Sequence, residues 1–313
     1  MPGKRSISNS LQGKYTPLLN KTIVDCWPLS SAVGRTSTAS SVFKVNKTQP
    51  STVSTMSSSL TTYYHNLTRY VATRPREAAL TSTAIAVTLS LAWVLSDFYA
   101  WKAFGTGGTP PTWAGYWRMT KIRINRFLLF GKDDLADASN LSSKGSKYLD
   151  AGKIPIRQGE RPRLIARTMP QRQVPYDKRV VAPLVEDRVA SMVATFATKY
   201  SDILEVRPSK TEGGSTDAIY AKPELPTLNP LAQNNKMLTT EIAHAHPSEG
   251  SLHVWLSEAD AKTVVEKGWG MRFPLYFVPK GWAMVYAPRT MEEVDVVETI
   301  VKAGIAFIAG VEV

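Results

Sequence analysis

Three of the chain's four histidines, His244, His246 and His253, lie within ten residues of one another. Imidazole is the side chain best suited to proton transfer or metal ligation near neutral pH. The first two histidines precede the segment from Pro247 to Gly250 and the third follows it. Proline and glycine at these positions are typical of a turn, and apolar residues alternate on both sides. The spacing therefore predicts two short strands joined by a turn at 247–250.

In such a hairpin His244 lies opposite His253, and His246 lies opposite Ser251. Side chains two residues apart on a strand, and those directly opposed across an antiparallel pair, project to the same side of the sheet. The three imidazoles are therefore predicted to share one face. Three further residues are predicted on the histidine face, namely Ile242, Ser251 and Trp255. The opposite face is predicted to be core-facing and holds Ala243, Ala245, Leu252, Val254 and Leu256.

Two chemistries fit this cluster, and the residues alone leave the choice between them open. A metal-free site would use the imidazoles as acids and bases, and this is our expectation. A metal site would use His244, His246 and His253 as a facial set of nitrogen ligands, with Glu241 or Glu249 as a carboxylate. The structural alternative is a set of hydrogen-bonded histidines on a half-buried sheet.

Charge is unevenly distributed along the 313 residues. The net charge is +12, but residues 1–76 contain ten Lys or Arg and one acidic residue, Asp25. The rest of the chain is close to neutral and has no basic stripe with interleaved aromatic residues, so we expect no nucleic-acid partner. Cys26 is the only cysteine, which excludes intramolecular disulfides and cysteine-based zinc sites. Residues 1–62 are rich in Ser and Thr without a sustained apolar period, which predicts disorder.

An uncharged run of nineteen residues extends from Ala78 to Ser96. As a helix it would be about 28 Å long, which is close to the thickness of the hydrocarbon core of a bilayer. We expect a single-pass membrane anchor over residues 78–98, with a buried helix of a soluble protein as the alternative. An endoplasmic reticulum or other endomembrane is the expected location, and a mitochondrial membrane is the alternative. The stretch from Trp113 to Phe130 mixes apolar and basic residues and is predicted to lie on the membrane surface.

The C-terminal part has the pattern of an α+β fold. Val181, Val185, Val189, Met192 and Phe196 recur at helical spacing. Strands are predicted at 202–206, 218–221, on both sides of the histidine turn and at 282–286. Capping boxes at Ser257 and Thr290 predict two more helices. This order predicts a mainly antiparallel sheet with packed helices. The predicted organisation is a disordered tail (1–77), the anchor (78–98), a membrane-proximal connecting region (99–178) and the α+β domain (179–313).

Motifs spread over residues 105–309 resemble the fungal luciferase family in order and spacing. The matching segments are Gly115-Tyr116, Pro155-x-Arg157-x-Gly159-x-Arg161-Pro162, Gln171-Arg172-Gln173, Glu241-Ile-Ala-His244-x-His246, Leu252-His253, Lys267-Gly-Trp-Gly270, Pro274-Leu275, Tyr286-Ala-Pro-Arg289, Glu292-Glu293 and Val296-Val297-Glu298. A hydrophobic anchor ahead of the domain also fits that family.

The resemblance implies a membrane-associated oxygenase. Fungal luciferases add molecular oxygen to a hydroxypyrone, and the resulting peroxide loses carbon dioxide, without an organic cofactor. The implied catalytic residues are His244, His246 and His253, one of which would take the acidic enol proton. Arg272 and Arg289 are implied to hold the anion. Trp255, Trp269 and Tyr286 are implied to enclose a small phenolic or pyrone substrate.

One residue departs from the pattern of the luminous family members. Where they have Gly-Trp-Gly-x-Arg-His-Pro-Leu, this chain has Phe273 in place of the histidine. The departure favours a non-luminous relative. Two other functions remain compatible with the sequence: a metal-dependent enzyme that uses the histidine cluster, and a non-catalytic, membrane-tethered module that binds a small molecule.

Overall fold

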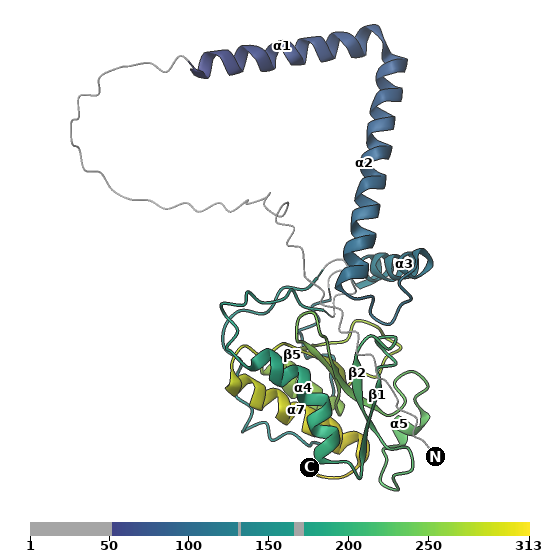
Figure 1. The fold of residues 1–313 in the computed structure, drawn as a ribbon, viewed down its shortest axis with the longest axis vertical. Coiled ribbons are helices and arrows are strands. Elements are labelled where there is room, and N and C mark those ends of the chain that lie inside the picture. Colours follow the sequence, from purple (N-terminus) through teal and green to yellow (C-terminus); the bar gives the residue numbers. More distant parts are fainter. Residues whose placement is uncertain (1–51, 131–132, 166–171) are drawn as a thin grey trace, which may run out of the picture. The chain divides into compact units, whose positions relative to one another are not determined.

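The computed structural model of this chain describes residues 52–130, 133–165 and 172–313 (Figure 1). Of these, the residues up to Tyr70 belong to one compact unit and those from Val71 onward to a second. Residues 1–51, most of the predicted disordered tail, lie outside the described part. Within that tail, residues 52–73 form helix α1 (Thr52–Thr73), so the prediction of disorder is wrong there. The prediction gave weight to the high Ser and Thr content and overlooked the apolar residues at helical spacing. These include Leu60, Tyr64, Leu67 and Val71.

Helix α2 (Pro75–Phe104) contains the whole of the predicted anchor. Proline at the first helical position is favourable because its missing N–H would have had no partner there. By length and composition, α2 can cross a membrane, and only 6% of its apolar window is buried within the structure. Large apolar side chains such as Leu80, Leu89 and Trp93 are exposed along it. A core helix of a soluble protein would bury these side chains.

Helix α3 (Trp113–Phe130) packs against the C-terminal end of α2. The Tyr116 hydroxyl donates a hydrogen bond of 2.7 Å to the buried carboxylate of Asp97, and Arg123 forms an ion pair of 3.2 Å with the same group. The ring of Phe98 stacks on Trp113 with centroids 3.9 Å apart. These contacts fix the start of α3 relative to the end of α2.

The described part of the domain contains a six-stranded sheet in which all neighbouring strands are antiparallel, as predicted. The strand order is β1-β2-β3-β4-β6-β5. The strands are β1 (Leu204–Pro208), β2 (Asp217–Ala221), β3 (Glu241–Ala245), β4 (Leu252–Trp255), β5 (Gly270–Arg272) and β6 (Trp282–Val285). The alternating pattern predicted all of these except β5, which has only three residues.

Helices α4 (Val185–Lys199) and α7 (Met291–Ala309) lie side by side across one face of the sheet (Figure 1). Helix α6 (Glu258–Glu266) packs against β5 and β6. At its closest approach to the sheet α7 carries Gly304, where an added Cβ would lie 2.9 Å from Val254 Cγ1. The main core therefore lies between the sheet and these helices, and the histidines point to the other face.

Local signals placed the helix starts correctly. Ser257 accepts a hydrogen bond from the Asp260 amide at α6, and Thr290 accepts one from the Glu293 amide at α7. The five-residue helix α5 (Pro230–Asn234) was not predicted. The predicted connecting region also contributes to the core, because Leu141, Leu149 and Ile154 are buried in it.

We expect α2 to hold the full-length protein in membranes after carbonate extraction. Replacing Ile85 and Leu89 together by Arg places two charges on exposed positions of α2. Each charge costs about 2.5–3.5 kcal/mol at the centre of a membrane-spanning helix, so the double variant should be released. The Ile85→Ala/Leu89→Ala variant is the matched control and should stay in the pellet. Release of the unmodified chain by carbonate would refute the anchor.

Candidate functional site

The hairpin has the register that the sequence predicts. Ala243 pairs with Val254, His244 with His253 and Ala245 with Leu252. Beyond the ladder, the His246 amide donates to the Ser251 carbonyl at 2.8 Å. The turn closes where the Gly250 amide donates to the His246 carbonyl at 2.8 Å, with Gly250 at a φ of +74°. This left-handed conformation suits glycine, and it fixes the two strands so that the three imidazoles share one face.

One neighbour of the histidines differs from the prediction. Between β2 and β3 the register shifts, since Ile219 pairs with Ala243 but Tyr220 pairs with Glu241. Ile242 is the extra residue, and its side chain packs toward α7 and not beside the histidines. The irregularity turns Glu241 to the histidine face instead, where its Oε1 lies 2.8 Å from His244 Nδ1. A β-bulge re-aims side chains in this way, and the alternating pattern does not reveal it.

The three imidazoles are buried and adjacent. Their ring centroids are 4.9–5.2 Å apart. His244 Nδ1 is bound by Glu241, and His246 Nδ1 lies 2.9 Å from Ser251 Oγ and 3.0 Å from Glu249 Oε1. Within the described residues, His244 Nε2, His246 Nε2 and both ring nitrogens of His253 have no hydrogen-bond partner. Four ring nitrogens of the three buried histidines are therefore left without a hydrogen-bond partner among the described residues.

Glu212 completes this group of side chains and was missed by the sequence analysis. Its Oε1 lies 3.5 Å from His246 Nε2 and 3.8 Å from His244 Nε2. It lies on the loop between β1 and β2, more than thirty residues before His244, and no motif or periodicity marks it. One ligand atom from each of Glu212, His244, His246 and His253 lies within 4.8 Å of the others. We refer to these four residues as the histidine–glutamate cluster.

Glu241 anchors the loop that carries Glu212. Its carboxylate accepts hydrogen bonds from Ser209 Oγ (2.8 Å), Thr211 Oγ1 (2.9 Å), the Tyr220 hydroxyl (2.8 Å) and the Lys210 amide (3.0 Å). The side chain of Glu241 is fully buried. A buried carboxylate needs such partners to offset its lost hydration. One side chain of β3 therefore positions both His244 and the loop ending at Glu212.

Arg172 is the cation of the site and was also missed as a functional residue, although the Gln-Arg-Gln motif contains it. Its Nε lies 2.6 Å from Glu249 Oε1, and its Nη2 lies 2.9 Å from Glu249 Oε2. Its Nη1 lies 3.5 Å from Glu212 Oε2. The guanidinium also lies over the ring of Phe104, at the end of α2. Arg172 thus connects the carboxylate that orients His246 with the carboxylate of the cluster.

The carboxylates are ionised and His253 is neutral at neutral pH. Burial opposes ionisation of Glu241, but hydrogen bonds and charge from His244, with Ser209 and Tyr220, lower its pKa to about 2. Burial is likewise outweighed at Glu249, where Arg172 and His246 lower the pKa to about 2. At Glu212, His246, His244 and Arg172 lower the pKa against the same penalty. Burial, together with His246 and His244, lowers the pKa of His253 well below its usual value.

A cavity of about 270 Å³ opens beside the cluster. Glu212 and His253 line it, so the cluster faces its interior. Phe273, Leu275, Val278 and Trp282 form apolar walls, and the ring of Trp282 stacks on His253 with centroids 5.5 Å apart. Helix α3 supplies Arg118, Met119 and Ile122, and the loop after α2 supplies Gly107, Gly108 and Thr109. We refer to this space as the aromatic cavity.

The loop after α2 closes one end of the aromatic cavity by a direct backbone contact. Gly108 has a φ of +71°, and a Cβ added there would lie 2.1 Å from the Thr211 carbonyl oxygen. Only glycine allows this approach. The glycine-rich loop after α2 is therefore packed against the loop that carries Glu212, and it connects α2 to the site.

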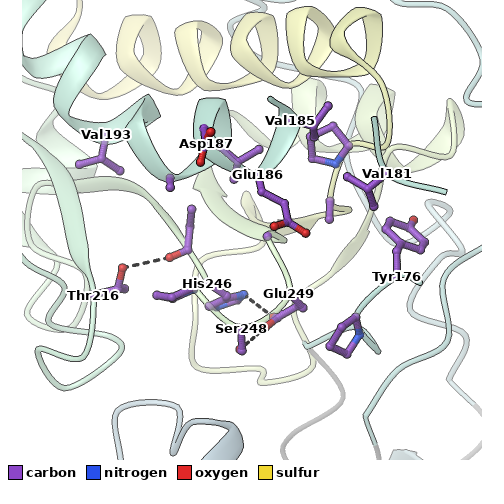
Figure 2. A pocket seen from close by; sticks show the side chains of 18 of the residues that line it. Tyr176, Val181, Val185, Glu186, Asp187, Val193, Thr216, His246, Ser248 and Glu249 are labelled. Atoms are coloured by element: carbon purple, nitrogen blue, oxygen red, sulfur yellow. Dashed lines mark hydrogen bonds and ion pairs between the residues drawn. The ribbon is translucent and has the colours of Figure 1, made fainter. Parts of the chain in front are cut away.

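A second cavity, of about 530 Å³, lies at the hairpin turn (Figure 2). Val185, Glu186 and Asp187 of α4 lie on one side, and His246, Ser248 and Glu249 lie on the other. Glu249 Oε1 is bound to His246 Nδ1 at 3.0 Å here. This cavity therefore borders His246, whereas the aromatic cavity borders Glu212 and His253.

The structure separates the other predicted site residues from the cluster. Trp255 lies on β4 opposite Trp282 and is buried in the core, and Trp269 donates from Nε1 to the Pro155 carbonyl at 2.7 Å. Arg272 binds Asp133 and the Asp137 carbonyl. Arg289 binds Glu293 and the Gln158 carbonyl. Tyr286 borders a different cavity, with Arg157 over its ring. None of these five lines the aromatic cavity, and their roles as substrate contacts stay predictions.

Comparison with known proteins matches the luciferase domain family to residues 239–304, which include the histidine hairpin. The luciferase of Armillaria gallica is 30% identical over 244 residues, covering 74% of this chain and 87% of the relative. The luciferase of Armillaria mellea is 30% identical over 250 residues, covering 75% and 89%. The luciferase of Neonothopanus nambi is 29% identical over 253 residues, covering 74% and 90%. No solved structure matches the chain significantly.

Replacing Arg172 by Met should strongly destabilise the domain, because two buried carboxylates lose their cation. Breaking a buried pair typically costs about 3–5 kcal/mol. The matched control is Arg161→Met, because the ion pair of Arg161 with Asp134 has half-exposed side chains and should contribute about 0–1 kcal/mol. Chemical denaturation of the two variants measures both values. An equal decrease in the free energy of unfolding of the two variants would show that Arg172 does not neutralise the buried carboxylates.

Proposed function

This chain belongs to the fungal luciferase family, and on that premise we propose that it is a membrane-anchored oxygenase of a small phenolic or hydroxypyrone substrate. The observation that carries the proposal is the opening of the unpaired imidazole of His253 into the aromatic cavity. The site thereby combines a cavity that has apolar walls with an imidazole that has no hydrogen-bond partner among the described residues. Molecular oxygen is the co-substrate, and no organic cofactor takes part.

The aromatic cavity suits a flat, acidic molecule. Trp282 and Phe273 offer ring faces and edges to it, and aromatic groups pack favourably in such arrangements. Its volume of about 270 Å³ is near the lower end of the range for small-molecule sites. Arg118 and Lys210 also line it and provide the positive charge that an enolate or phenolate needs. We propose that these two residues help to hold the anion, the role that the sequence predicts for Arg272 and Arg289.

The proposed chemistry begins with removal of the acidic hydroxyl proton. The imidazole of His253 borders the cavity and has no hydrogen-bond partner among the described residues, so it is placed to accept this proton. The electron-rich anion then adds dioxygen at carbon, which forms a C–O bond and a peroxide. For a hydroxypyrone, the peroxide closes on the carbonyl group and releases carbon dioxide, so both oxygen atoms end in the products. Exclusion of water by the apolar walls protects the peroxide from side reactions.

The membrane is the proposed source of the substrate. Trp117, Phe127 and Leu128 are exposed on α3, and Phe277 is exposed at the edge of the aromatic cavity. Together with α2, these residues suit contact with the interface of a bilayer. An apolar phenolic molecule dissolved there would be close to the cavity. An endoplasmic reticulum or other endomembrane is the proposed location.

Replacing His244, His246 or His253 by Gln should lower turnover by roughly 10²–10⁴-fold while the fold persists. Gln keeps hydrogen-bonding capacity but does not titrate near neutral pH. Turnover is measured as oxygen uptake with a panel of hydroxypyrones and phenols, beside the thermal midpoint. A double variant should be scarcely worse than the worst single one, because the residues act as a unit.

The control for these variants is His65→Gln, since His65 lies on α1 outside the cluster and should leave turnover unchanged. A purely structural role gives the opposite pattern, with stability lowered by about 1–3 kcal/mol and full activity per folded molecule. Tight binding of the same compounds without oxygen uptake by the unmodified chain would identify a binding module in place of an oxygenase.

Phe273 should restrict light emission. Its ring lies 5.2 Å from that of His253 and lines the aromatic cavity, and it replaces an imidazole of the luminous family members. Phenylalanine neither exchanges a proton nor donates a hydrogen bond to a peroxide. We expect little or no light with the fungal luciferin. Phe273→His should raise the light yield at least about tenfold, since acid–base groups commonly contribute ~10²–10⁴-fold.

The matched control is Tyr63→His at an exposed position of α1, which should leave the light yield unchanged. Emission by the unmodified chain at the level of an authentic fungal luciferase, at matched protein amounts, would contradict this role for Phe273.

A further inference from the structure

We propose that the histidine–glutamate cluster binds one divalent first-row transition-metal ion. The ligands are His244 Nε2, His246 Nε2, one ring nitrogen of His253 and the carboxylate of Glu212. Binding of the ion requires neither substrate nor turnover, so metal content tests this inference without an activity measurement. A bound ion would take over from His253 the ionisation of the proposed substrate.

The distances between the ligand atoms fit a single ion. All four lie within 4.8 Å of one another, with Glu212 Oε1 3.5 Å from His246 Nε2 and 3.8 Å from His244 Nε2. Ligands about 2.1 Å from a common ion lie ~3.4 Å apart in a tetrahedron and up to ~4.2 Å apart across an octahedron. The distances from Glu212 Oε1 to the two Nε2 atoms already lie within this range, and the other separations need to shorten by no more than about 1.4 Å.

The outer partners have the arrangement that metal-binding histidines use. A ligating histidine almost always gives its second ring nitrogen to a carboxylate, carbonyl or water, which fixes the tautomer and the ring orientation. His244 gives Nδ1 to Glu241, and His246 gives Nδ1 to Glu249 and Ser251. The two Nε2 atoms are then left on the side of Glu212, 3.8 Å and 3.5 Å from its Oε1. A set of merely structural histidines would have used these nitrogens in hydrogen bonds.

The charge of the buried groups supplies an independent argument. Glu212, Glu241 and Glu249 are at most 8% exposed, and Arg172 is 3% exposed. Three carboxylates and only one guanidinium are therefore buried together at this site. A buried carboxylate needs a positive charge or hydrogen-bond donors beside it. A divalent cation between the imidazoles and Glu212 would supply positive charge at this position.

The donor set limits the choice of ion. Three imidazole nitrogens with one carboxylate oxygen suit zinc, iron, manganese, cobalt, nickel or copper. Calcium and magnesium prefer oxygen ligands in greater number. No cysteine is present among the described residues, because the only one in the chain, Cys26, lies outside them.

The open side of the ion would face the aromatic cavity, which Glu212 and His253 line. A phenolate or enolate oxygen there would be able to reach the ion. The same nitrogen atom does not serve as a metal ligand and as a base, so the metal-bound site would ionise the substrate by coordinating its oxygen. Loss of turnover on His→Gln substitution is expected in either case, and the metal content separates the two.

The test measures metal content of the full-length chain, purified in detergent with a tag that contains no histidine. Elemental analysis should find about one equivalent of a transition metal, which a strong chelator removes and which Zn²⁺, Mn²⁺, Fe²⁺ or Co²⁺ restores. Removal should lower the thermal midpoint, because an ion that binds only the folded state stabilises it. Less than a tenth of an equivalent, no uptake of any of these four ions and no shift of the midpoint would overturn the proposal.

Variants locate the ion within the structure. Glu212→Gln and His246→Gln should abolish stoichiometric retention, and Glu241→Gln should weaken affinity by roughly 10–100-fold through loss of the outer partner. His65→Gln is the matched control and should retain the ion. Circular dichroism shows whether each variant is folded. Full retention by folded Glu212→Gln and His246→Gln would place the metal elsewhere and overturn the assignment.

Discussion

Burial of three carboxylates beside three imidazoles is the constraint on which the rest of the site depends. Each ionised group must recover from its neighbours the hydration that it loses. Glu241 does so with four donors from the loop between β1 and β2 and from Tyr220. Glu249 does so with Arg172, which lies more than seventy residues away in the chain. Because these charges need partners, loops from separate parts of the sequence pack against one face of the sheet.

Much of the fold was predictable because its signals are local. Strand alternation, the turn at Gly250 and the caps at Ser257 and Thr290 each act over a few residues, and the structure confirms them. The shared face of the three histidines follows from the same local rule, because strand periodicity and an antiparallel register are enough to specify it.

The parts that were missed depend on contacts between distant segments. Neither Glu212 nor Arg172 has a local signature, because their roles come from the folding of loops onto the hairpin. Because of the bulge at Ile242, the side chain of Glu241 and not that of Ile242 lies on the histidine face. The alternation of apolar and polar residues in the sequence does not show whether a bulge is present. Helix α1 was missed because its Ser and Thr content outweighed its apolar spacing in the composition.

The site divides into two parts that different elements build. The sheet and the loop before β2 hold the histidine–glutamate cluster, whereas α3 and residues 273–278 form much of the cavity wall. A substitution in the wall, such as phenylalanine for histidine at position 273, therefore changes what touches the substrate without removing a cluster residue. On the proposed function, members of one family are then able to keep the same cluster while differing in the molecule that they bind and in what becomes of the product. Membership of a luciferase family, on this physical basis, does not require that a member emit light.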